Sequence, residues 1–94
     1  MDTAFLSATN LIRALRAKRI GALELLELYI KRVERYDGAL NALPVRDFAA
    51  ARKRAKAFDR KGAKPGPLAG LPMTVKESYN LAGHPTTWGL EEYR

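Results

Sequence analysis

The sequence contains no cysteine, one histidine and two serines. Without cysteine the chain can form no disulfide, and it has neither a thiol nucleophile nor a thiolate ligand for a metal ion. No stretch approaches the roughly eighteen consecutive apolar residues of a membrane-spanning helix. The first residues, Met1-Asp2-Thr3, lack the basic start and apolar core of a secretory signal. These absences favour a cytoplasmic protein.

Acidic residues are also scarce, with ten Asp and Glu against seventeen Lys and Arg, which gives a net charge of +7. The 94 residues allow one small domain with a marginal core. An apolar content of 47% is typical of a globular chain, so the sequence does not indicate disorder.

The positive charge is concentrated between residues 52 and 64, where seven cations are offset only by Asp59. The cations are Arg52, Lys53, Arg54, Lys56, Arg60, Lys61 and Lys64. Such a face can bind a polyanion. Aromatic residues for base stacking are not interleaved with these charges, which favours a solvated helix face, and we do not expect a nucleic-acid partner. A small basic nucleic-acid-binding module is therefore kept as the alternative function, beside a helix-mediated interaction module.

Hydrophobic spacing predicts three helices. The first begins near a cap at Ser7, Thr9 or Asn10 and ends at Ile20-Gly21. The others cover residues 22–36, after a cap at Gly21, and residues 48–61, after a cap at Asp47. Asp37-Gly38 is predicted to end the second helix. Its apolar surface is wider than one stripe, which indicates neighbours on more than one side and possible self-association of the chain.

Two segments read as strands, residues 40–45 and 71–78, and residues 84–88 form a third strand or an extended loop. Residues 62–70, rich in glycine and proline, are predicted to be an exposed connector. The order strand, helix, strand from residue 40 to residue 78 is typical of an α/β unit in which helices cover a sheet.

Lys76 stands out because it follows Val75 in a stretch that otherwise reads as a buried strand. Burial lowers the pKa of a lysine, and a neutral amine can act as a base. The ordinary alternative is a lysine at a strand end whose long stem carries the amine to water.

The residues around Lys76 change the weight of these alternatives. Residues 66–77 read G-P-L-x-G-L-P-x-x-V-K-E, and residues 82–89 read A-G-x-P-T-T-x-G. This pattern resembles the lysine-bearing segment of the amidase signature family, with Glu77 where Asp is more usual. Weaker resemblance extends upstream to Glu24, so almost the whole chain matches the amino-terminal portion of a longer domain. The resemblance implies an α/β fold, in which residues 1–94 are one partial domain with three helices and two or three strands of a mixed sheet.

The resemblance also implies a chemistry. Amidases of this family cleave a carboxamide C–N bond through an acyl-enzyme. A serine is the nucleophile, and a second serine, held by a cis peptide bond, passes the proton to a lysine that corresponds to Lys76. A small-molecule amide substrate is implied, without a cofactor or a metal. Both serines belong to a glycine- and serine-rich segment that these 94 residues lack, and we expect the chain alone to be inactive.

Two other side chains were weighed for chemistry. Ser78 would share a strand face with Lys76, but no glycine-lined turn accompanies it to supply an oxyanion hole. His84 has no second histidine or cysteine to complete a metal site, and we expect it in a surface turn.

Overall fold

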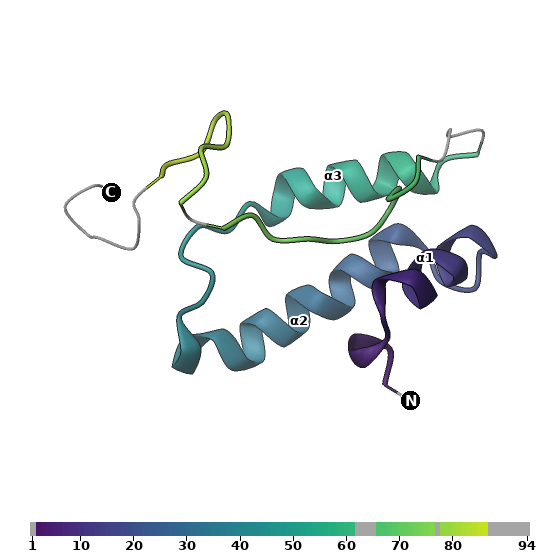
Figure 1. Cartoon of the computed structure of the whole chain (residues 1–94), viewed down its shortest axis with the longest axis horizontal. Helices are drawn as coiled ribbons and strands as arrows, with labels where there is room; N and C mark the ends of the chain where they lie inside the picture. Colours follow the sequence, from purple (N-terminus) through teal and green to yellow (C-terminus); the bar gives the residue numbers. More distant parts are fainter. Residues whose placement is uncertain (1, 62–65, 77, 87–94) are drawn as a thin grey trace.

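A computed structural model of the chain describes residues 2–61, 66–76 and 78–86. These residues form a short 3-10 turn, η1 (Thr3–Phe5), and three helices, α1 (Ala8–Arg16), α2 (Ala22–Leu40) and α3 (Phe48–Asp59). α2 and α3 pack against each other and run in opposite directions, while α1 lies beside the first half of α2 (Figure 1). The three helices therefore confirm the helical part of the prediction.

The helix starts follow the capping residues in the sequence. The N–H of Asn10 donates to Ser7 Oγ at the start of α1 (3.2 Å), and the N–H of Ala50 donates to Asp47 Oδ1 at the start of α3 (3.4 Å). α2 begins after Gly21 as predicted, but glycine has no side chain with which to cap it. Asp59 at the end of α3 does so instead, since its two carboxylate oxygens accept from the N–H groups of Ala22 and Leu23 (2.7 and 3.0 Å).

The predicted end of α2 at Asp37-Gly38 is wrong, because the helix continues to Leu40 and closes on Asn41 in the left-handed conformation (φ 52°). Asp37 is 6% exposed, and its carboxylate accepts from the N–H groups of Ala42 and Leu43. Arg46 Nη2 also donates to it at 2.8 Å. The chain is thus wrapped around Asp37 where a strand over residues 40–45 was predicted.

The predicted α/β fold is also wrong: the described residues contain no strand and no sheet. Residues 71–76 are extended, but no backbone hydrogen bond joins them to a distant segment of the described chain. An extended segment becomes a strand only when a neighbour pairs with its N–H and C=O groups. Residues 84–86 follow a turn without strand structure, and the rest of the predicted 84–88 strand lies outside the described residues.

The hydrophobic core is small and lies between the helices. The buried apolar residues of the described chain are Leu11, Ala22, Leu25, Ile30 and Ala55. α2 exposes Tyr36 and Leu40 near its end, and Phe58, predicted on the inner face of α3, is 47% exposed. Most other exposed large apolar side chains follow α3, namely Leu68, Met73, Val75, Tyr79 and Leu81. The predicted wide apolar surface therefore lies mainly after α3, not on α2.

No helix in the described part of the chain has the length and apolar content needed to cross a membrane.

Candidate active site

The residues that follow α3 are called here the lysine-bearing segment, described as residues 66–76 and 78–86. The segment begins with two tight turns, in which the N–H of Ala69 donates to the Gly66 carbonyl and that of Leu71 to the Leu68 carbonyl. Gly70 has a φ of +84°, a conformation that side chains of L-residues rarely adopt. A Cβ at Gly70 would lie 3.2 Å from Ala22 Cβ and 3.5 Å from Leu15 Cδ1. Glycine is thus required here both by the turn and by the close approach to α1 and α2.

Lys76 lies at the end of the extended stretch and is exposed. Its neighbours Met73 and Val75 are also exposed, at 76% and 48%. The expected burial of the Lys76 amine depended on a sheet, and without a sheet in the described residues nothing covers this side chain. The structure therefore shows where Lys76 lies in the segment without surrounding it by a catalytic pocket.

The chain turns directly after Lys76, because the N–H of Tyr79 donates to the Lys76 carbonyl (3.0 Å). A turn removes the strand geometry that would have placed Ser78 and Lys76 on one face. No hydrogen bond joins the two side chains within the described residues. Ser78 is half-buried, and the structure gives no support to a local serine–lysine pair.

His84 lies in a surface turn, as expected, but it has a partner that sequence reasoning missed. Its Nε2 lies 2.6 Å from Asp47 Oδ2, and its Nδ1 lies 3.0 Å from the Ala82 carbonyl oxygen. The hydrogen bond to Asp47 raises the pKa of His84, with a further contribution from the Ala82 carbonyl. The same contact lowers the pKa of Asp47. The two residues are separated by 37 positions, so only the fold brings them together.

The lysine-bearing segment is attached to the helices at two described places. Near its start, Gly70 packs on Leu15 and Ala22, and near its end His84 pairs with Asp47 at the start of α3. The other hydrogen bonds of the described segment stay within it. Lys76 lies between these two attachments, in the part of the segment that crosses the α2–α3 pair (Figure 1).

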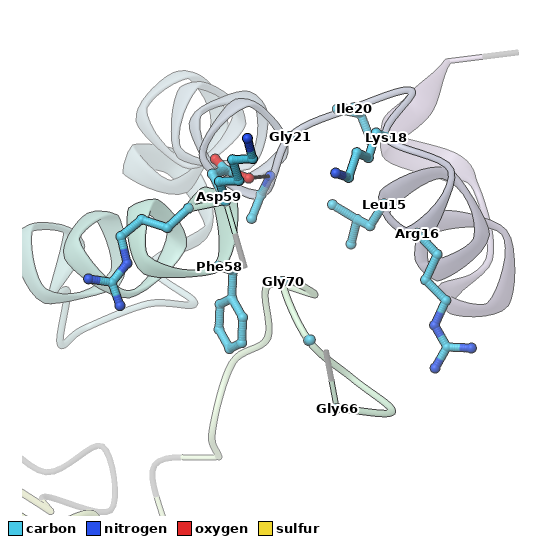
Figure 2. Close-up of a pocket in the computed structure, with 13 residues that line it drawn as sticks. Leu15, Arg16, Lys18, Ile20, Gly21, Phe58, Asp59, Gly66 and Gly70 are labelled. Carbon is cyan, nitrogen blue, oxygen red and sulfur yellow. Dashed lines mark hydrogen bonds between the residues drawn. The ribbon is translucent and has the colours of Figure 1, made fainter. Parts of the chain in front are cut away.

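A cleft of about 650 Å³ lies where the turn at Gly66–Gly70 meets the start of α2 and the end of α3 (Figure 2). Leu15, Ile20 and Phe58 supply apolar lining. Four cations also line it, namely Arg16, Lys18, Arg60 and Lys61. Asp59, its acidic residue, binds the first N–H groups of α2. Lys76 does not line this cleft, so the cleft and the candidate catalytic residue are separate features.

The basic run predicted on α3 is divided by the fold. Arg52 donates through Nε and Nη2 to the carboxylate of Glu27 on α2 and so joins the two helices. Lys53, Arg54 and Lys56 are exposed, while Arg60 and Lys61 border the cleft, and Lys64 lies outside the described residues. Within the described chain, no group of three or more acidic or histidine side chains is arranged to hold a metal ion.

Comparisons with known proteins agree with the motif around Lys76. The family model described as Amidase matches residues 24–94. The putative amidase AmiB2 of Mycobacterium tuberculosis (strain ATCC 25618 / H37Rv) is 37% identical over 90 residues, which are 94% of this chain and 20% of that protein. Fatty-acid amide hydrolase 2-B of Danio rerio is 35% identical over 96 residues, covering 92% of this chain and 18% of the hydrolase.

A third relative belongs to the glutamyl-tRNA(Gln) amidotransferase of Aromatoleum aromaticum. It is 39% identical over 85 residues, which are 88% of this chain and 17% of that protein. No solved structure matches the chain significantly. The chain spans about a fifth of the length of these curated relatives.

Proposed function

Because the chain belongs to the amidase family, we propose that it supplies the general base of an enzyme that hydrolyses the C–N bond of a carboxamide. The observation that carries this proposal is the position of Lys76 in the G-P-L-x-G-L-P-x-x-V-K-E pattern, inside the range that the family model matches. The names of two relatives, a putative amidase and a fatty-acid amide hydrolase, support the same reaction class.

The proposed chemistry gives Lys76 one task. A serine hydroxyl attacks an amide carbonyl well only when a base removes its proton. In the proposed triad the second serine, on a cis peptide bond, takes that proton and passes its own to Lys76 Nζ. The proton then returns to the nitrogen of the departing amine, and water hydrolyses the acyl-enzyme. Ser7 and Ser78 are the only serines in the 94 residues, and neither lies in a glycine- and serine-rich segment.

The exposure of Lys76 bears on what the 94 residues can do alone. A lysine acts as a general base only in its neutral form, which burial favours. Lys76 is exposed in the described structure, and Met73, Val75 and Tyr79 beside it expose apolar surface. We therefore propose that further residues of an intact amidase cover this surface, and that the isolated 94-residue chain does not hydrolyse amides.

An exchange experiment tests the proposal. Residues 1–94 replace the matching part of the Danio rerio fatty-acid amide hydrolase 2-B, and hydrolysis of a fluorogenic fatty-acid amide is measured. We expect the chimera to be active, Lys76→Ala to abolish activity, and Lys53→Ala, an exposed lysine on α3, to leave it intact. Circular dichroism and thermal denaturation show whether each variant is folded.

A smaller graft of residues 66–86 provides a second test if the larger exchange does not fold. Activity that survives Lys76→Ala in a folded chimera would contradict the assignment of Lys76. Lysine-dependent hydrolysis by the isolated chain would contradict its proposed inactivity.

A further inference from the structure

The ion pair between His84 and Asp47 contains information about protons. Both ring nitrogens of His84 face oxygen acceptors, Nδ1 the Ala82 carbonyl and Nε2 the Asp47 carboxylate. A neutral imidazole has one N–H and can donate to only one of them, whereas an imidazolium donates to both. The observed geometry is therefore satisfied in full only when His84 is protonated and Asp47 is ionised.

Asp47 can hold this partner without giving up its place at the helix. Its Oδ1 accepts from the N–H of Ala50 as the cap of α3, and its Oδ2 faces His84. Arg54, on the same helix, adds a positive charge that further favours the ionised carboxylate. Asp47 and Arg54 are thus the charged groups of α3 that act on the pair, and the segment itself contributes the Ala82 carbonyl.

Hydrogen bonds connect this pair to Lys76 through the segment. The N–H of Tyr79 donates to the Lys76 carbonyl, and the hydroxyl of Thr86 donates to the Tyr79 carbonyl at 3.5 Å. The N–H of His84 closes the intervening turn by donating to the Leu81 carbonyl (3.0 Å). The stretch from Lys76 to Thr86 is therefore folded on itself, and His84 provides its polar attachment to a helix within the described residues.

We propose that Asp47 and His84 form a proton-dependent clasp that positions the Lys76-bearing loop against the start of α3. Its value for catalysis rests on the proposed function of Lys76, whereas the clasp itself does not. The histidine contribution is fully present below the pKa of a free histidine and is lost as pH rises through the raised pKa of His84. The aspartate contribution is lost as pH falls through the lowered pKa of Asp47. The clasp is closed between these two limits.

Nuclear magnetic resonance can test the clasp in the 94-residue chain, because His84 is its sole histidine and gives one unambiguous imidazole signal. The variant Asp47→Asn removes the charge but keeps a good helix cap. We expect the His84 titration midpoint to shift downward in Asp47→Asn and to stay unchanged in Glu34→Gln, which removes an exposed carboxylate of α2.

The amide signals of Lys76 and Tyr79 report on positioning. They should titrate with the His84 midpoint in the unaltered chain and lose this response in Asp47→Asn. An identical His84 midpoint in the unaltered chain and Asp47→Asn would overturn the proposal, as would loop amides that ignore the His84 titration.

The active chimera separates the clasp from the proposed function. Asp47→Asn should lower hydrolysis most at pH values below the His84 midpoint and least above it, where the clasp is open in both proteins. A changed His84 midpoint together with activity that survives Lys76→Ala would keep the clasp and reject the function of Lys76. Lysine-dependent activity with an unchanged His84 midpoint would reject the clasp alone.

Discussion

The α2–α3 pair and the lysine-bearing segment differ in how their own residues hold them. The helices satisfy their backbone groups internally, bury Leu25, Ile30 and Ala55 between them, and are joined by the Asp59 cap and the Glu27–Arg52 pair. The segment is extended, exposes Met73 (76%) and Tyr79 (67%), and has one described ion pair with a helix. The residues that identify the family are thus concentrated in the region with the weaker attachments.

This difference shows that a recognisable motif need not be a self-sufficient structure. The motif around Gly66–Lys76 constrains backbone shape through its glycines and prolines, yet the apolar side chains between them remain without partners in the described chain. We infer that the helical pair acts as the scaffold and that the segment depends on contacts beyond those described. The predictions below test whether the two regions respond separately.

The largest effect is expected in the helical core. Leu25 is fully buried (0% exposed), so Leu25→Ala removes apolar contacts and leaves a cavity. Comparable substitutions cost about 2–5 kcal/mol of unfolding free energy. Leu40→Ala, at a residue that is 72% exposed, should cost less than about 0.5 kcal/mol. Urea denaturation followed by circular dichroism measures both, and equal losses would show that Leu25 is not part of a packed core.

A smaller and more local effect is expected at the first attachment of the segment. Gly70→Ala places a Cβ 3.2 Å from Ala22 Cβ in a left-handed conformation (φ +84°), and such strain is of order 1–3 kcal/mol. The chain can relieve it by lifting the segment from α2, so hydrogen exchange at the Leu71 N–H should accelerate.

Gly83 is the matched control for this variant. Its φ is +81°, but a Cβ there meets nothing within 4 Å. Gly83→Ala should therefore leave exchange at Leu71 unchanged. Acceleration in both variants would indicate that backbone strain alone, and not the approach to Ala22, loosens the segment.

The smallest effect is expected from the cap that α3 gives to α2. Asp59→Ala leaves the N–H groups of Ala22 and Leu23 without their carboxylate and should cost about 1 kcal/mol. In a domain of this size that corresponds to a fall of roughly 4–8 °C in Tm. Asp59→Asn keeps an oxygen acceptor and should lose less. A thermal scan that finds both variants as stable as the parent would show that the cap does not stabilise the pair.

The sequence predicts the helices better than it predicts what lies between them. Helical periodicity and caps such as Ser7 and Asp47 are local signals, which explains why the three helices are confirmed. The end of α2 depends on the Asp37 carboxylate reaching residues beyond the helix, and the predicted strands required neighbours that the described chain does not supply.

The candidate site shows the same division. The pattern around Lys76 is contiguous and can be recognised directly in the sequence. The pairing of His84 with Asp47, and the capping of α2 by Asp59, join residues far apart along the chain. Neither contact leaves a periodic or spacing signal, so only the folded arrangement reveals them.

The most direct test of the central claim is the ratio of kcat/KM between the amidase chimera and its Lys76→Ala variant, measured on the same amide. If Lys76 is the general base, that ratio should be about 10² to 10⁴, while Lys53→Ala leaves kcat/KM unchanged. A ratio near one in folded protein would contradict the account.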